Sequence, residues 1–196
     1  MIYDISQPLF GCEVYPGDPK PEKKELLRME RGDLYNLTAI SLSVHNGTHV
    51  DAPRHFIEDG KGIDKIELSR FIGPAYVASH DGELGRADAE KLVERAKKAD
   101  ARAWKKLLIK GNATVTPEAA TCFADAGLEL IGNESQTVGP KETPMAVHLI
   151  LLRKDVILLE GIRLAGVPDG VYLLNCAPLN LTGADGSPCR AVLMDL

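Results

Sequence analysis

The chain has 196 residues, of which 44% are hydrophobic and 26% charged, and its formal charge is −5. This length and apolar content predict a single domain over residues 1–196 and exclude a disordered or low-complexity chain. The acidic balance disfavours a nucleic-acid partner, because sequence-independent binding of phosphate backbones needs basic surface. A small molecule is therefore the expected partner.

The cellular compartment is predicted from the leader region and the cysteines. The first thirty residues hold no basic segment followed by a long apolar stretch, and no apolar run approaches the roughly 18 residues that span a bilayer. No C-x-x-C pair occurs among the four cysteines, which are Cys12, Cys122, Cys176 and Cys189. We expect reduced thiols in a cytoplasmic protein with no membrane partner.

Alternating and short apolar runs predict the strands. Ile40, Leu42 and Val44 alternate with small or polar residues, which predicts a half-buried strand that ends at the Asn46-Gly47 turn. Six further apolar runs, each bounded by turn residues, predict strands: 74–79, 107–109, 128–131, 156–159, 171–174 and 191–194.

Helices are expected between some of these strands. Residues 88–98 carry apolar side chains at helical spacing, and a Thr116-Pro117 start and a Gly127 stop predict a second helix. A third begins at Thr143-Pro144 and runs to about residue 153, and residues 183–186 predict a turn before the final strand. This mixed order predicts an α/β domain with a mixed β-sheet core and flanking helices.

Residues 44–56 carry the strongest chemical signal. Three of the five histidines and one aspartate, His45, His49, Asp51 and His55, lie within eleven residues, punctuated by Gly47 and Pro53. Zinc and manganese bind imidazole nitrogens and carboxylate oxygens, and a shaped loop could present them together. A polar loop with surface histidines is the alternative, but the density of these residues favours a metal site.

The segment resembles a known family signature. Residues 45–56 match the pattern H-x-G-T-H-x-D-x-P-x-H-F of the cyclase family of metal-dependent hydrolases, which includes kynurenine formamidases and isatin hydrolases. Tyr15-Pro16-Gly17-Asp18 is similar to the family's aromatic-P-G-D element, and residues 177–179 and 186–191 are similar to its closing segment. The resemblance implies a swivelling β/β/α-like fold.

The resemblance also implies a site. It assigns His45, His49 and Asp51 as metal ligands, Asp51 as a bridge between two divalent ions, Zn²⁺ or Mn²⁺, and His55 as the proton-transfer group. His148 and Glu160 would complete the second metal site. The sequence supports that last pair independently, because His148 lies in an apolar run and Glu160 ends an apolar strand, and buried ionisable groups need a partner or a metal.

The expected function is hydrolysis of a small carbonyl substrate by a metal-activated water, as an amide hydrolase of the arylformamidase type. Ring opening of a cyclic amide or ester is the alternative, and a non-catalytic metal-binding scaffold is a remote one. Tyr15, a candidate substrate-binding residue, stands where kynurenine formamidases carry Trp, and residues 132–140 also depart from their pattern. Within that segment Glu134 and Gln136 face substrate or lie on a solvated loop. The resemblance further implies a homodimer or homotetramer.

Overall fold

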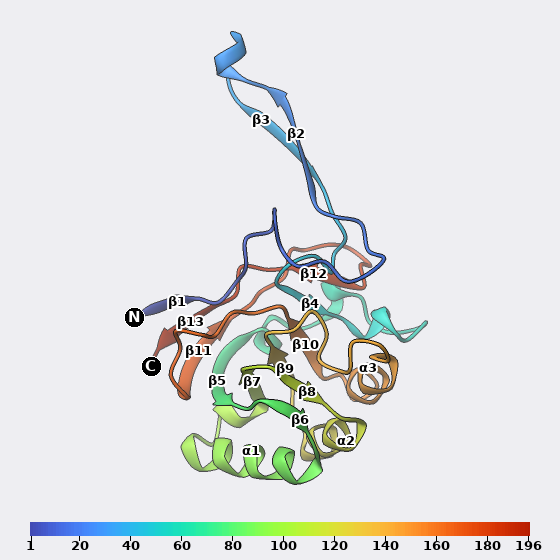
Figure 1. The fold of residues 1–196 in the computed structure, drawn as a ribbon, viewed down its shortest axis with the longest axis vertical. Coiled ribbons are helices and arrows are strands. Elements are labelled where there is room, and N and C mark those ends of the chain that lie inside the picture. The colour runs from blue at the N-terminus through green and yellow to red at the C-terminus, as the bar shows by residue number, and fades with distance from the viewer.

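The computed structural model describes all 196 residues and is built around a nine-stranded mixed sheet (Figure 1). Four neighbouring strands, β5, β7, β9 and β10, run parallel, and the remaining pairings of the sheet are antiparallel. In spatial order the strands are β1 (Ile2–Asp4), β13 (Val192–Asp195), β11 (Gly170–Asn175), β5 (Ile72–Ser79), β7 (Lys106–Lys110), β9 (Leu130–Asn133), β10 (Ile157–Glu160), β4 (His49–Asp51) and β12 (Gly186–Pro188). The predicted mixed-sheet α/β fold is confirmed, and all six short apolar runs form strands.

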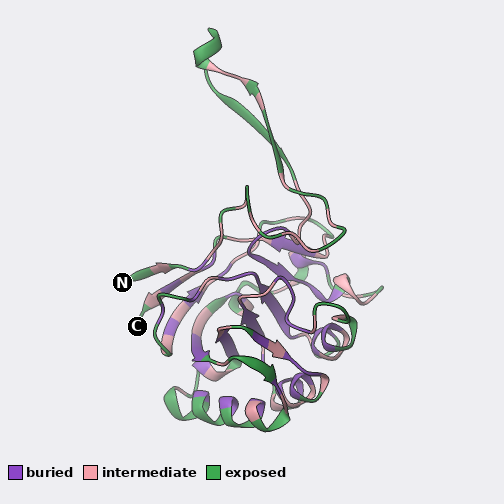
Figure 2. Cartoon of the chain, viewed as in Figure 1, coloured by how far each residue is buried: buried purple, intermediate pink, exposed green.

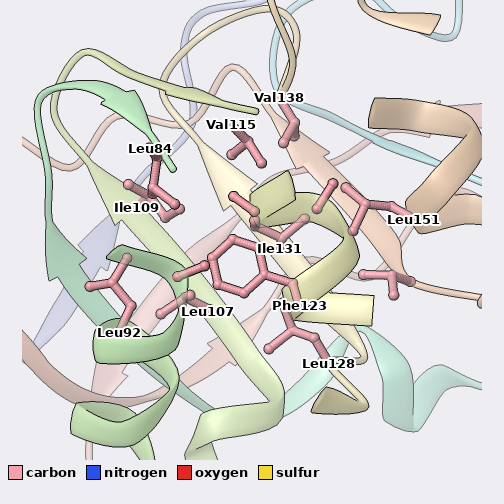
Figure 3. Close-up of a cluster of buried hydrophobic side chains, with 14 of the residues drawn as sticks. Leu84, Leu92, Leu107, Ile109, Val115, Phe123, Leu128, Ile131, Val138 and Leu151 are labelled. Carbon is pink, nitrogen blue, oxygen red and sulfur yellow. The ribbon is translucent and has the colours of Figure 1, made fainter. Parts of the chain in front are cut away.

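Two apolar layers cover the two faces of the sheet. Successive side chains of a strand point to opposite faces, so Leu107 and Ile109 of β7 enter one layer while Leu108 enters the other. Figure 3 shows the first layer, where Phe123 packs among side chains of the helices and of the sheet. The sheet is therefore buried on both faces and forms a rigid platform for its short edge strands.

Three helices lie on one side of this sheet: α1 (Arg86–Ala99), α2 (Pro117–Ala126) and α3 (Met145–Leu152). The predicted signals at both ends of α2 are confirmed, since Thr116 Oγ1 accepts the Ala119 N–H at 3.2 Å and Gly127 has φ +87°. The predicted Thr143 cap of α3 is wrong. The Thr143 N–H instead closes a turn on the Pro140 carbonyl, and the helix begins one residue after Pro144.

A two-stranded ribbon of β2 (Glu22–Leu27) and β3 (Leu37–Ser41) projects far from the body (Figure 1). The half-buried strand predicted from Ile40, Leu42 and Val44 is wrong: β3 ends at Ser41, and all five of its residues are exposed (Figure 2). At its root Lys23 Nζ lies over the Phe10 ring and Ile40 lines a hollow with Leu9, but most residues of the ribbon stay exposed. A short parallel pair, β6 (Gly82–Leu84) and β8 (Ala113–Val115), completes the strands. None of the helices is both long and apolar enough to cross a bilayer.

Candidate metal centre

The register between β4 and β10 gathers three of the predicted ligands on one face of the sheet. His49 and Asp51 are two residues apart on β4 and so point to the same side, and Glu160 of β10 lies directly opposite His49. Val50, between them, enters the apolar layer on the other face. All three ligand candidates are buried, which removes them from competing water.

His148 reaches the same place from helix α3. Its Nε2 lies 3.3 Å from Glu160 Oε1 and 3.6 Å from Asp51 Oδ2, while its Nδ1 is 2.9 Å from the Pro144 carbonyl oxygen. Since that carbonyl can only accept, Nδ1 carries a hydrogen, and Nε2 is the nitrogen available to a metal beside the two carboxylates. The start of α3 therefore fixes the orientation of this ring.

His45 comes from the turn before β4. Gly47, at φ +69°, reverses the chain so that His45 Nδ1 lies 2.9 Å from Asp51 Oδ1. Gly186 of the neighbouring strand β12 makes room for the ring, because a Cβ at that position would lie 2.8 Å from His45 Cε1. The Gly47 carbonyl accepts from His49 Nδ1 at 3.0 Å, which leaves His49 Nε2 facing Glu160 and Asp51.

The spacing of these atoms fits a bound divalent cation. His49 Nε2 lies 3.5 Å from Asp51 Oδ1 and 3.4 Å from Glu160 Oε2, too long for good hydrogen bonds. Ligands about 2.0–2.2 Å from a tetrahedral zinc are separated from one another by roughly 3.3 Å. Moreover, Asp51 Oδ2 is buried without any hydrogen-bond partner in the chain. Nitrogen and carboxylate donors of this kind suit zinc or manganese.

Electrostatics within the cluster are strongly coupled. Burial alone would lower the pKa of His45, but the hydrogen bonds that His45 donates to Asp185 and Asp51 outweigh it and raise the pKa to about 10. Burial likewise opposes protonation of His148, yet Asp51 and Glu160 raise its pKa to about 10. The histidines in turn hold the pKa of Asp51 well below its usual range despite its burial. Without a metal, protons therefore serve as the counter-charge of the buried carboxylates.

These shifts predict how the metal-stripped chain responds to pH. His45 and His148 each have a pKa near 10 in the folded chain, against an ordinary value of 6.5. Their protonation therefore stabilises the folded state fully below pH 6.5, and this contribution is lost as pH rises through about 10. We expect the melting temperature of the metal-free chain to fall between pH 7 and pH 10.5, and to fall less in His148→Gln. An equal fall in both proteins would contradict this assignment, since lysines and tyrosines titrate in both.

A cavity of about 290 Å³ opens onto the cluster. Tyr15 lies in its wall, where the sequence places a substrate-binding residue, and the Tyr15 hydroxyl donates to the Lys141 carbonyl at 2.7 Å. His55 follows β4 on a short 3₁₀ turn, and its ring also lines the cavity. The cavity is lined by Tyr15, Asp18, His45, His49, His55, Phe56, Gln136, Thr137, Pro144, His148 and Glu160.

The structure thus brings together all six predicted metal and proton-transfer residues. Sequence analysis missed Asp185, which it assigned only to a turn, although Asp185 Oδ2 lies 2.7 Å from His45 Nε2. Glu134 does not face the cavity, because its carboxylate accepts the Gly111 and Leu164 N–H groups, whereas Gln136 does line it. Trp104 packs against the helix-side apolar layer and does not line the cavity.

The fold and the cluster define a class, that of α/β proteins with a buried His/Asp/Glu centre at the edge of a mixed sheet. The sequence matches the Cyclase family, described as putative cyclase, over residues 3–140. The chain belongs to this family, so the resemblance drawn from its motif is confirmed.

Relatives and solved structures place the chain within that family. A kynurenine formamidase from Erythrobacter litoralis (strain HTCC2594) is 34% identical, covering 100% of this chain and 94% of that protein. The structure of a predicted metal-dependent hydrolase from Bacillus stearothermophilus is 27% identical, with a TM-score of 0.81 over 98% of this chain and 97% of that one. Isatin hydrolase A from Labrenzia aggregata shares the fold, with a TM-score of 0.84 over 100% and 93% of the two chains at 22% identity.

Proposed function

We propose that the chain is a metal-dependent amide hydrolase of the arylformamidase type. It would hold two divalent ions, Zn²⁺ or Mn²⁺, with Asp51 between them. The observation that carries this proposal is the convergence of five ligand side chains, four lining one cavity and Asp51 buried behind them, in a chain that a kynurenine formamidase matches from end to end. The proposed ligands are His45, His49, Asp51, His148 and Glu160.

A bound divalent ion supplies an acidified water and polarises a substrate carbonyl. Side chains of the protein would supply proton transfer and substrate binding. His55 lies in the cavity wall with one edge toward Asp185, so its other ring nitrogen is free to take a proton from the attacking water and return it to the leaving amine. Tyr15 and Phe56 contribute aromatic walls that suit an aryl group.

The proposal is tested by assaying the zinc- and manganese-reconstituted protein on N-formylkynurenine and, beside it, on isatin, each with a chelator control. We expect chelator-sensitive release of formate from the formamide. Turnover of isatin alone would assign ring opening instead, the alternative that the sequence leaves open. Bound metal with neither substrate hydrolysed would contradict the arylformamidase assignment.

We further propose that the ribbon of β2 and β3 packs against a second copy of the chain in a homodimer or homotetramer. An isolated two-stranded ribbon is marginally stable in water, and large exposed apolar patches mark interaction sites. The ribbon and its tip expose Leu26, Met29, Leu34, Tyr35, Leu37 and Ile40. At its root lies a hollow of about 840 Å³ with an apolar lining that includes Leu9, Ile40 and Leu42.

Leu34 is the most exposed of these side chains, at 93%, and is the best place to test the ribbon. We expect Leu34→Ser with Tyr35→Ser to weaken self-association at least about tenfold, since truncating a central apolar anchor costs about 2 kcal/mol. Sedimentation velocity measures this, with the mass of one chain being 21.2 kDa. Leu68→Ser, at an apolar residue 60% exposed outside the ribbon, is the matched control. A wild-type protein that sediments as a monomer would contradict the proposal.

We also infer that residues 1–196 form one domain in the cytoplasm. The main sheet joins strands from both ends of the chain, since β1 pairs with β13. The four cysteines are free thiols, which are typical of a reducing compartment.

A further inference from the structure

Asp185 is the charged residue of the site that neither the motif nor the metal ligands account for. It sits between two histidines of different roles, and both contacts involve the same oxygen: Oδ2 lies 2.7 Å from His45 Nε2 and 3.4 Å from His55 Nδ1. We propose that Asp185 is a positioning residue that fixes the rings of a metal ligand and of the proton-transfer group with one carboxylate. This inference rests on the proposed function.

For His45, the contact determines which nitrogen is free to bind metal. Carboxylate oxygens only accept, so without a metal His45 donates from Nε2 to Asp185 and from Nδ1 to Asp51. Asp185 keeps the hydrogen on Nε2, so Nδ1 is the nitrogen that would give up its proton to a metal held with Asp51. His49 and His148 have the same arrangement, but their outer acceptors are the carbonyls of Gly47 and Pro144. Asp185 is therefore the charged member of a set of three outer acceptors, and charge-assisted hydrogen bonds are the stronger kind.

For His55, the same oxygen selects the nitrogen that faces substrate. Nδ1 is the nitrogen nearer Asp185, so Nε2 is the one left to accept a proton within the cavity. The rings of His45 and His55 are tilted by 30° to each other with centroids 3.9 Å apart, so a single carboxylate reaches both edges. Loss of Asp185 would therefore free two rings at once.

Backbone hydrogen bonds hold Asp185 against residues 45–56, which fixes the position from which its side chain extends. The Asp185 carbonyl accepts the Ala52 N–H at 2.9 Å, one residue after Asp51. The preceding residue, Ala184, accepts the Ile63 N–H at 2.8 Å, and the Gly183 N–H donates to Asp64 Oδ1 at 2.9 Å. The sheet pairing of Gly186 with Asp51 continues this contact.

The first test measures zinc affinity by competition with a chelator, which needs no substrate. We expect Asp185→Ala to bind zinc about 10- to 100-fold more weakly than wild type, the usual cost of losing an outer partner of a metal-binding histidine. Asp64→Ala is the matched control, because it releases the same loop without touching either histidine, and it should stay within about twofold of wild type. Equal losses in the two variants, or none in Asp185→Ala, would overturn the proposal.

The second test separates the effect on His55 from the effect on metal. At saturating zinc, Asp185→Ala should lower kcat more than it changes KM in the wild-type background, and should have no further effect on kcat in His55→Ala. Additive losses in the double variant would overturn the role toward His55. If wild type hydrolyses no formamide, the proposed function fails while the zinc titration still decides the role toward His45.

Discussion

Replacing Asp51 with Asn should leave a folded protein that binds metal poorly and has lost hydrolysis by at least about 10³-fold. Asp51 Oδ1 lies 2.9 Å from His45 Nδ1 and 3.5 Å from His49 Nε2. Asp51 Oδ2 lies 3.6 Å from His148 Nε2, so one carboxylate faces all three histidines. Asn preserves the shape but removes the charge. Without the ions, attack depends on water with a pKa near 15.7 instead of one near 7, which is why a large loss is expected.

The measurement is metal content after reconstitution and dialysis, together with kcat and a circular dichroism spectrum. Asp59→Asn is the matched control, since Asp59 is an exposed acid on the neighbouring loop with no ion pair. Two ions per chain in Asp51→Asn, or formamide turnover within tenfold of wild type, would contradict the bridging role. An unfolded spectrum would call for Asp51→Glu, which keeps the charge and should retain at least one ion.

His55→Ala should keep its metal and lose roughly 10²- to 10⁴-fold in kcat, the usual contribution of a positioned acid or base. The side chain is 27% exposed in the cavity wall, and its Nδ1 lies 3.4 Å from Asp185 Oδ2. It is therefore free to exchange protons with substrate and solvent. The loss should appear in kcat at saturating substrate, with KM changed little, because a proton is moved only in the transition state.

His80→Ala is the control for this experiment, as His80 is the one histidine outside the site, where its Nε2 contacts the Glu83 carbonyl. Metal content is measured on the same samples as the rate. If His55→Ala keeps wild-type turnover, the proton-transfer role is wrong. If it loses its ions instead, His55 is a ligand, consistent with its ring lying close to His45 and Asp51.

Local patterns in the sequence were sufficient to predict the central strands of the sheet and most residues of the site. Strands β7, β9 and β10 are short apolar runs between turn residues, and their burial on both faces accounts for that pattern. Likewise His45, His49 and Asp51 are close along the chain, so their proximity in space follows from a turn and one strand.

Features that depend on distant contacts were missed. The alternation at Ile40 and Leu42 indicates a strand with an apolar face, but the single chain leaves most of the ribbon exposed. Asp185 lies in a Gly-rich turn, and it meets His55 only because β12 pairs with β4 across more than a hundred residues of chain. No local spacing carries that information. The only available signal was an acidic residue immediately before residues 186–191, which resemble the family's closing segment.

The most direct test of metal-dependent hydrolysis is to titrate zinc back into the metal-stripped protein while the hydrolysis of an aryl formamide is followed. We predict that the stripped protein is inactive, that activity rises with added zinc and saturates at two ions per chain, and that a chelator reverses the gain. Activity that is present in the stripped protein, or that does not respond as zinc fills the cluster of His45, His49, Asp51, His148 and Glu160, would contradict a metal-dependent hydrolase.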